Sequence, residues 1–370
     1  MEACKDKDLL GFGCMRLPMK DDEVDYEQFN QMIDLYMEAG FNYFDTAHGY
    51  ISGKSETAIR DCLVARYPRE SYQIVNKLSS YHFETEEEIR PLFEKQLKQT
   101  GVSYFDYYFM HAQDRTNYKQ YTQTRAYEIA QELKAEGKVK HVGISFHDNA
   151  ETLEMILKEH PEIELVQIQF NYMDYDDASI QGKEVYEVCR KYNKPMAIME
   201  PAKGGALINL PDHAKEVLDA IGSGSYASYA NRFAGSFDGV VRVVSGMSTV
   251  GDVKDNISYM QDFQPLTGEE FKAVEKVKDI LKELGGVACT SCGYCVDDCP
   301  ANIPIPEVFS AYNAKLQFND WNSGMYYSIY TKAKGKASDC ITCGLCESVC
   351  PQHLSIIDVL GDVAKAFEEQ

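Results

Sequence analysis

Eight of the twelve cysteines in this 370-residue chain lie between Cys289 and Cys350, where one spacing occurs twice. Each copy reads C-x2-C-x2-C-x3-C-P: the first is Cys289, Cys292, Cys295 and Cys299 followed by Pro300, and the second is Cys340, Cys343, Cys346 and Cys350 followed by Pro351. Three thiolates on so tight a loop can bind three irons of one cubane, while the displaced fourth thiolate reaches another cluster. The segment is therefore predicted to fold around two 4Fe-4S clusters.

The same spacing predicts how the thiolates are shared between the clusters. Cys289, Cys292, Cys295 and Cys350 are expected to form one ligand set, and Cys340, Cys343, Cys346 and Cys299 the second. Paired C-x2-C units also build tetrahedral zinc sites. Zinc explains poorly two quartets that each end in Cys-Pro, so it is the less favoured alternative.

The other four cysteines, Cys4, Cys14, Cys62 and Cys189, are scattered singly and are expected to be small buried apolar side chains. The first residues contain no basic run followed by an apolar core, so no secretory signal is predicted and a cytoplasmic location is expected. Clustered cysteines in a chain of that kind indicate metal rather than disulfides.

Net charge and hydropathy exclude two classes of partner. The formal net charge of -21 at pH 7 opposes binding to nucleic acid phosphates and to anionic membrane surfaces. No stretch approaches the ~20 consecutive apolar residues of a membrane span. Neither nucleic acid nor a membrane is therefore an expected partner.

Ahead of the cysteine motifs, short apolar or aromatic runs alternate with amphipathic segments, which is typical of parallel strands alternating with helices. The eight runs predicted as strands are residues 9–13, 41–45, 73–77, 105–110, 141–145, 165–169, 196–200 and 241–245. The predicted helices are residues 26–39, 56–66, 86–99, 121–136, 150–160, 182–192, 226–237, 251–262 and 267–284. Gly40, Gly101 and Gly137 lie where helix C-terminal turns need a positive φ. The pattern favours an α/β fold, a closed (β/α)8 TIM barrel, over an open sheet, since no Gly-x-Gly-x-x-Gly follows any strand.

Gly285-Gly286 is a natural hinge, and it predicts two domains: a barrel over residues 1–285 and a small, mostly helical iron-sulfur domain over residues 286–370. Two helices are predicted between the cysteine motifs, near residues 306–316 and 324–333. This module resembles the helical di-cluster ferredoxins that are fused to redox enzymes. It carries ten acidic residues against five lysines and no arginine, so a redox partner that docks there is expected to present a basic face.

Four short segments of the barrel portion carry a resemblance to a known family. They are residues 11–18 (GFGCMRLP), 44–50 (FDTAHGY), 76–77 (NK) and 109–111 (FMH), and they resemble the aldo-keto reductase family over about residues 1–285. In that family an Asp, a Tyr five residues later, a Lys and a His form the active site. Asp45, Tyr50, Lys77 and His111 match these positions, which implies an oxidoreductase that interconverts a carbonyl and an alcohol with a nicotinamide cofactor.

The chemistry of these four residues can also be argued directly. Asp45, Lys77 and His111 end or closely follow consecutive strands, at the barrel face where active sites lie, and Tyr50 is in the loop above. A phenol with a pKa of about 10 is a poor acid at neutral pH until a neighbouring cation favours the phenolate. Lys77 would supply that cation, Asp45 would hold it, and His111 would donate to the substrate oxygen. Tyr50 is then the acid in reduction and the base in oxidation.

The resemblance also implies a cofactor site. Ser145 and Gln167 occupy the positions that hold a nicotinamide carboxamide, and Met199 stands where most members stack a Tyr on that ring. In the loop and helix after the last strand, the expected contacts are Gly246, Asp252 and Asn256. Since Asp252 stands where a cation usually clasps the 2'-phosphate of NADP(H), we expect NAD(H) to be favoured.

Hydride moves two electrons at once, whereas each cluster passes one. The leading hypothesis is a carbonyl or alcohol oxidoreductase whose clusters exchange electrons with a partner such as a ferredoxin or a flavoprotein. The rival hypothesis is a ferredoxin-like electron-transfer subunit whose barrel is only a docking or flavin-binding body. A flavin would couple the two kinds of transfer, but the sequence contains no flavin fingerprint.

Overall fold

The computed structural model describes residues 9–177, 180–222, 224–287, 289, 294–297, 299–318, 322–350 and 354–369. Its contacts divide the chain into two compact units. One unit consists of Met1–Lys203 with Gly224–Phe271, and the other of Gly204–Ser223 with Lys272–Gln370. The predicted domain boundary at residues 285 and 286 remains a prediction.

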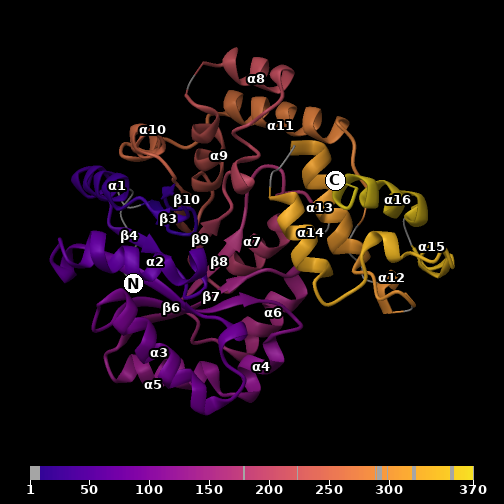
Figure 1. Ribbon diagram of the computed structural model, residues 1–370. Coiled ribbons are helices and arrows are strands. Elements are labelled where there is room, and N and C mark those ends of the chain that lie inside the picture. Colours follow the sequence, from indigo (N-terminus) through magenta and orange to yellow (C-terminus); the bar gives the residue numbers. More distant parts are fainter. Residues whose placement is uncertain are drawn as a thin grey trace. The chain divides into compact units, whose positions relative to one another are not determined.

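The first unit contains a closed barrel of eight parallel strands in the order β1-β10-β9-β8-β7-β6-β5-β4 (Figure 1). The strands are β1 Leu10–Gly13, β4 Tyr43–Asp45, β5 Gln73–Leu78, β6 Phe105–Gln113, β7 Val139–Phe146, β8 Leu165–Gln169, β9 Met196–Met199 and β10 Val240–Gly246. Each overlaps one of the eight predicted strands, and the predicted fold class is confirmed. The strands are buried on both faces by side chains and surrounding helices, which is why their sequences are almost continuously apolar.

Helices follow the strands around the barrel. They are α1 Tyr26–Glu38, α2 Lys54–Ile59, α3 Glu86–Thr100, α4 Tyr118–Gln123, α5 Ala126–Ala135, α6 Ala150–Glu159, α7 Gly182–Lys191, α9 Tyr226–Gly235 and α10 Val250–Met260. One predicted helix, over residues 121–136, is in fact two, because Arg125 has a left-handed backbone with φ of 55° between α4 and α5. The short hairpin of β2 Met19–Lys20 and β3 Glu23–Val24 was not predicted, since two-residue strands leave no periodic pattern.

Gly143 allows close packing inside the barrel. Gly143 of β7 lies beside the Phe109 ring and the carbonyl oxygen of Leu165, and a Cβ at this position would approach them to 2.6 and 2.5 Å. These distances are shorter than van der Waals contact. The missing side chain therefore makes room for the ring of Phe109 in the barrel interior, where Tyr43 and Val75 belong to the same apolar cluster.

The second unit is helical. It contains α8 Asp212–Asp219, most of α11 Gly268–Glu283, α12 Tyr294–Asp297, α13 Ile305–Phe318, α14 Ser323–Thr331, α15 Leu345–Ser348 and α16 Ile356–Phe367. The two predicted helices between the cysteine motifs correspond to α13 and α14. Both α14 and α16 pack against α13, around a core that includes Val308, Phe309 and Leu360. Among the residues described, no helix combines the length and apolarity that a membrane crossing needs.

Candidate active site and iron-sulfur site

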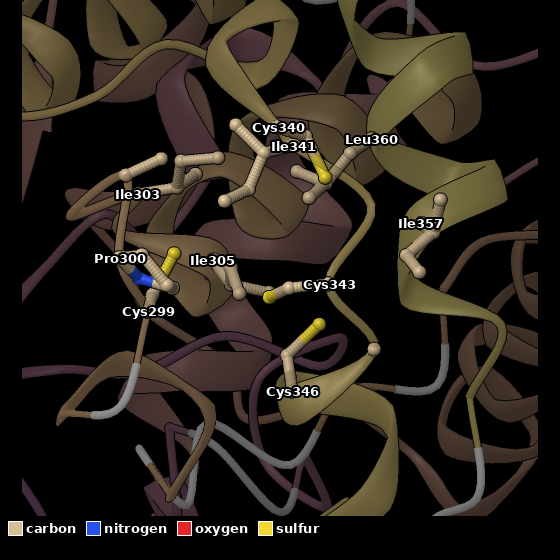
Figure 2. Close-up of a pocket in the computed structure, with 12 residues that line it drawn as sticks. Cys299, Pro300, Ile303, Ile305, Cys340, Ile341, Cys343, Cys346, Ile357 and Leu360 are labelled. Carbon is tan, nitrogen blue, oxygen red and sulfur yellow. The ribbon is translucent and has the colours of Figure 1, made fainter.

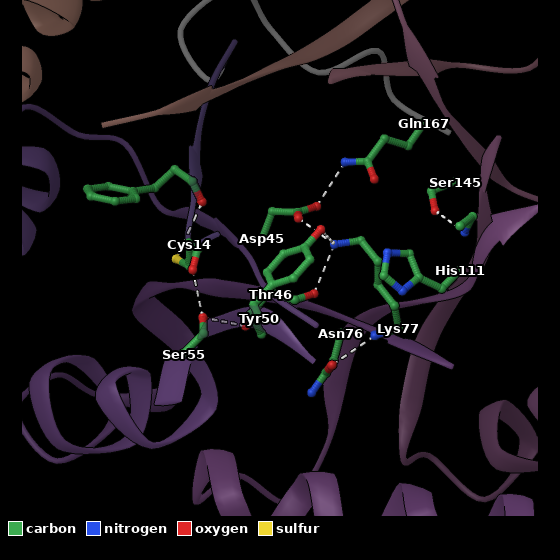
Figure 3. A network of polar contacts seen from close by, with 12 residues as sticks. Cys14, Asp45, Thr46, Tyr50, Ser55, Asn76, Lys77, His111, Ser145 and Gln167 are labelled. Atoms are coloured by element: carbon green, nitrogen blue, oxygen red, sulfur yellow. Dashed lines mark hydrogen bonds and ion pairs between the residues drawn. The ribbon is translucent and has the colours of Figure 1, made fainter. Parts of the chain in front are cut away.

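Three of the four predicted catalytic residues come from neighbouring barrel strands, and the fourth comes from the loop above them (Figure 3). Asp45 is the last residue of β4, Lys77 lies near the end of β5, and His111 lies in β6. Tyr50 begins the short 3-10 turn that follows β4. Since β4, β5 and β6 are paired in parallel, their carboxyl ends meet at one end of the barrel.

The Lys77 ammonium is the centre of this arrangement. Its side chain is fully buried, and Nζ donates to Asp45 Oδ1 at 2.5 Å, to the Thr46 carbonyl oxygen at 2.9 Å and to Tyr50 Oη at 3.0 Å. An ammonium has three protons, and each has an acceptor here. Burial acts to lower the pKa of Lys77, but the attraction of Asp45 and Tyr50 outweighs it, so the pKa is raised and the cation persists at neutral pH.

Tyr50 and His111 are both uncharged at neutral pH. Burial raises the pKa of Tyr50 above its usual value, and the opposing effect of Lys77 does not cancel that rise. The effect of Lys77 has the expected direction, but the larger opposing effect of burial was not predicted from the sequence. Burial, followed by repulsion from Lys77, lowers the pKa of His111 well below its usual range. The two rings lie 6.0 Å apart, so a protonated phenol and a neutral imidazole stand side by side.

A buried carboxylate supports the base of the site. Glu56 has no exposed surface, and it accepts from Asn76 Nδ2 at 2.8 Å and bonds His48 Nδ1 at 2.7 Å. Asn76 precedes Lys77 and accepts from its backbone N–H at 2.8 Å. The network therefore ties α2, which follows the Tyr50 turn, to the strand that carries Lys77.

Two of the predicted cofactor residues are neighbours in the barrel, and one of them contacts a predicted catalytic residue. Ser145 of β7 and Gln167 of β8 are paired in register. Gln167 Nε2 donates to Asp45 Oδ2 at 2.9 Å, and Ser145 Oγ accepts from the Ala112 N–H at 2.8 Å. Met199 and Gly246 are the last residues of β9 and β10 and so lie at the same end of the barrel.

The predicted contacts on α10 have structural partners of their own. Asp252 accepts from the backbone N–H groups of Ser248 and Thr249, both at 2.9 Å, and so forms the capping box that starts the helix. Asn256 Nδ2 donates to the Asp252 carbonyl oxygen at 2.9 Å, and its Oδ1 accepts from Asn231 at 3.1 Å. These bonds explain both residues without a cofactor, so their cofactor role stays a prediction.

Arg16 was not singled out from the sequence, although it lies in one of the family-like segments. The structure brings it beside the end of β10: a Cβ on Gly246 would lie 3.7 Å from Arg16 Cδ, and Ser248 Oγ donates to the Arg16 carbonyl oxygen at 2.8 Å. Its guanidinium lies 3.9 Å from the Glu200 carboxylate. No spacing could have revealed this cation, because Arg16 and Gly246 are at opposite ends of the barrel sequence.

The second unit contains a pocket lined by four cysteines from both motifs (Figure 2). Cys340, Cys343 and Cys346 come from one loop and its short helix α15, and Cys299 comes from the first motif. Apolar side chains complete the wall, among them Ile303, Ile305, Ile357 and Leu360. Four thiols in an apolar setting suit an iron-sulfur cluster. In the described part of the chain, no three His, Cys, Asp or Glu side chains converge as the ligands of a single metal ion do.

The other predicted ligand set is only partly visible. Cys289, Cys295 and Cys350 border the apolar core of this unit, whereas Cys292 lies outside the described residues. Helix α12, which carries Cys295, packs against α15, which carries Cys346. The two cysteine motifs are therefore neighbours in space, as an exchange of their fourth ligands requires.

A comparison with protein families decides what kind of chain this is. Residues 9–279, about three quarters of the sequence, match the model of the aldo/keto reductase family. The chain belongs to the aldo/keto reductase family. This membership makes the chain an oxidoreductase, and residues 288–355 of this aldo/keto reductase match the model of a 4Fe-4S dicluster domain.

Curated relatives resemble parts of this aldo/keto reductase. It is 37% identical over 106 residues to 4-dihydromethyl-trisporate dehydrogenase of Mucor mucedo, covering 27% of this chain and 30% of that protein. It is 23% identical over 124 residues to an Archaeoglobus profundus protein that is named for its likeness to one subunit of heterodisulfide reductase, covering 31% of this chain and 57% of that protein. The chain thus spans less than two thirds of either relative.

Solved structures of aldo-keto reductases share the barrel. One from Klebsiella pneumoniae, in complex with NADPH, has a TM-score of 0.60 at 18% identity and covers 73% of this chain and 90% of that one. The holo form of one from Bacillus halodurans has a TM-score of 0.58 at 23% identity and covers 72% of this chain and 91% of that one. At identities this low, the similarity shows a common fold and nothing about the substrate.

Proposed function

We propose that this aldo/keto reductase interconverts a carbonyl and an alcohol with a nicotinamide cofactor, and that Tyr50 is its general acid and base. The observation that carries the proposal is the Lys77 ammonium, which donates to Asp45 and Tyr50 at once beside the neutral ring of His111. A barrel with only a structural role has no need for a buried cation that touches a partly exposed phenol.

Each residue has a definite task in reduction. When bound, the nicotinamide supplies a hydride to the carbonyl carbon. Tyr50 transfers its proton to the carbonyl oxygen, and Lys77 stabilises the phenolate that is left, because its ammonium lies 3.0 Å from that oxygen. Asp45 holds Lys77 in place, and His111 orients the carbonyl by a hydrogen bond. In oxidation the Tyr50 phenolate removes the proton from the alcohol.

The pKa directions predict opposite pH dependences for the two reactions. Because the pKa of Tyr50 lies above its usual value of about 10, the phenol stays protonated through neutral pH. Carbonyl reduction is expected to be level from about pH 6 to 9 and to fall as the pH rises through the pKa of Tyr50. The rate of alcohol oxidation should instead rise with pH until the pH passes the pKa of Tyr50, because oxidation needs the phenolate. Steady-state rates in both directions provide the measurement, and reduction that increases with pH would contradict the assignment.

For the cofactor we propose a site at Ser145, Gln167, Met199, Gly246, Asp252 and Asn256, with a preference for NAD(H). The negative charge of Asp252 repels a 2'-phosphate. The cation Arg16, whose side chain lies near Gly246, is 3.9 Å from the Glu200 carboxylate, which offsets its attraction for a phosphate. Asp252→Asn removes the charge but keeps an oxygen that can accept from Ser248 and Thr249. NADH is expected to bind about fivefold more tightly than NADPH, and the variant should narrow the gap. Calorimetric titration that shows tighter NADPH binding to the wild type would rule this out.

For the second unit we propose two 4Fe-4S clusters that pass electrons to or from a partner such as a ferredoxin or a flavoprotein. The supporting observation is the cysteine pocket, in which Cys343 is exposed to solvent while Cys346 is buried. A thiolate at the surface gives a partner a short path to the cluster. The excess of ten acidic residues over five lysines in residues 286–370 favours a partner with a basic face.

A rival function is an electron-transfer subunit whose barrel does no carbonyl chemistry. One experiment distinguishes it from the leading proposal. If a bound flavin splits the electron pair of the hydride, NADH is expected under anaerobic conditions to bleach the visible absorbance of the clusters in a protein that also reduces carbonyls. Coupling requires an intermediary that splits the electron pair, so a bound flavin should be sought in the same sample. Bleaching without carbonyl reduction would favour the rival, and carbonyl reduction without bleaching would show that the clusters are not coupled to the barrel.

A further inference from the structure

One residue that the catalytic proposal does not use touches the proposed hydrogen-bond donor. Ser79 follows β5, two residues after Lys77, and is 2% exposed. Its hydroxyl oxygen lies 2.5 Å from Nδ1 of His111. In the described part of the chain, this is the one hydrogen bond that the Ser79 side chain makes to protein.

A neutral imidazole carries its single proton on either Nδ1 or Nε2, and the neighbours of the ring decide which. If Nδ1 carried the proton and donated it to Ser79, the buried Ser79 hydroxyl proton would have no protein acceptor. Such an unsatisfied buried donor costs about 1–3 kcal/mol. If Ser79 donates to Nδ1 instead, both groups are satisfied and the imidazole proton is on Nε2.

We propose that Ser79 is a positioning residue that donates to Nδ1 of His111 and thereby keeps the imidazole proton on Nε2, where it can donate to the substrate oxygen. The inference rests on the proposed function for its consequence, since a carbonyl or alkoxide oxygen needs a donor. The tautomer itself can be measured without a substrate. Ser79 thus decides whether His111 presents a donor or an acceptor.

The backbone around the pair is held by a second hydroxyl. Tyr121 of α4 places Oη 2.7 Å from the Leu78 carbonyl oxygen and 2.8 Å from the His111 carbonyl oxygen, and it accepts from the Ser80 N–H at 3.0 Å. The Tyr121 hydroxyl therefore contacts the backbone of both neighbours of Ser79 and the backbone of His111, and so joins the end of β5 to β6. This clamp keeps the Ser79 hydroxyl and the imidazole at a fixed separation, as a preorganised donor requires.

The direct test is the 15N spectrum of histidine-labelled holoprotein, with the His111 signal assigned from a His111→Gln sample. The wild type is expected to show the Nε2–H tautomer, and Ser79→Ala to show a mixture of both tautomers. A wild-type spectrum with the proton on Nδ1 would overturn the proposal whether or not the enzyme reduces carbonyls. A Ser79→Ala spectrum identical to that of the wild type would do the same.

Kinetic measurements distinguish the hydrogen-bonding role of the Ser79 hydroxyl from the role of the Ser79 side chain in packing. Ser79→Ala is expected to lower kcat for carbonyl reduction about tenfold with little change in the KM of the nucleotide. Ser79→Cys keeps the size but has only a weak S–H donor, so it should resemble Ser79→Ala, whereas Ser79→Thr should recover most of the rate. Recovery by Cys but not by Thr would show that packing alone matters and would overturn the proposal.

A pH profile gives a third readout. A bond that Nδ1 accepts favours the neutral ring, so its loss should raise the pKa of His111, and the 15N shifts of the ring should titrate at higher pH in Ser79→Ala than in the wild type. Lys77, His147 and His82 also act on the pKa of His111, and the Tyr50 ring faces it at 6.0 Å; all four residues are unchanged in the variant. Thr100→Val, which removes a buried hydroxyl that bonds the Gln96 carbonyl oxygen, is a matched control that should leave both the rate and the pH profile unchanged.

Discussion

Replacing Tyr50 by phenylalanine is expected to lower the rate of carbonyl reduction at least about a thousandfold, while the visible absorbance of the clusters stays the same. The substitution removes the hydroxyl that Lys77 contacts, and it leaves the aromatic ring over which the ammonium lies at 4.6 Å. Loss of rate without loss of cofactor binding would mark a residue that acts in the transition state. The measurement is kcat with saturating nucleotide and a series of aldehydes and ketones.

Tyr186→Phe is the matched control for this experiment. The Tyr186 hydroxyl donates to the carbonyl oxygen of Asp238, which precedes β10 and so lies at the end of the barrel away from the site. Its removal should leave kcat within about twofold of the wild type. If Tyr50→Phe were as active as Tyr186→Phe, another group must supply the proton and the proposed mechanism would be wrong.

Replacing Cys299 by alanine is expected to halve the iron content, from about eight to about four atoms per chain. Cys299 belongs to the first motif by sequence, but it lines the pocket of Cys340, Cys343 and Cys346. Its loss should therefore destroy the cluster of the second motif. Iron analysis of the anaerobically purified protein, together with the electron paramagnetic resonance of the reduced form, provides the measurement.

Cys189→Ala controls for the loss of a thiol as such. Cys189 is fully buried in α7 of the barrel, and burial raises the pKa of its thiol to about 12, which is typical of an inert structural cysteine. Its replacement should leave the iron content unchanged. If Cys299→Ala removed the cluster of the first motif instead, the exchange of fourth ligands between the motifs would be refuted.

The barrel could be predicted because its strands are short, buried and separated by periodic helices, so each leaves a local pattern. Details that depend on a single backbone angle could not be predicted. The break between α4 and α5 occurs at Arg125, whose left-handed conformation no propensity favours. Helix α16 also escaped prediction, although it buries Leu360 and Val363 in the core of the second unit.

The candidate site also has features that could be predicted from the sequence and features that could not. Cysteine spacing within each loop is local, and so is the distance of five residues between Asp45 and Tyr50, which is why both could be recognised in the chain. The pKa of Tyr50 depends on how far the folded chain shields its hydroxyl from water, and no pattern of neighbours in sequence reports that shielding. The sequence therefore predicted that Lys77 favours the phenolate, but it did not predict the larger opposing effect of burial.

The chain itself determined the kind of chemistry, since residue types and their spacing specify which groups can bind iron or exchange a proton. Only the folded barrel decided how those groups are tuned: it placed the Ser79 hydroxyl against His111 and the aliphatic part of the Arg16 side chain beside Gly246. Contacts of this kind join residues that lie far apart in the sequence. Their energies depend on distance and burial, which are properties of the tertiary structure alone.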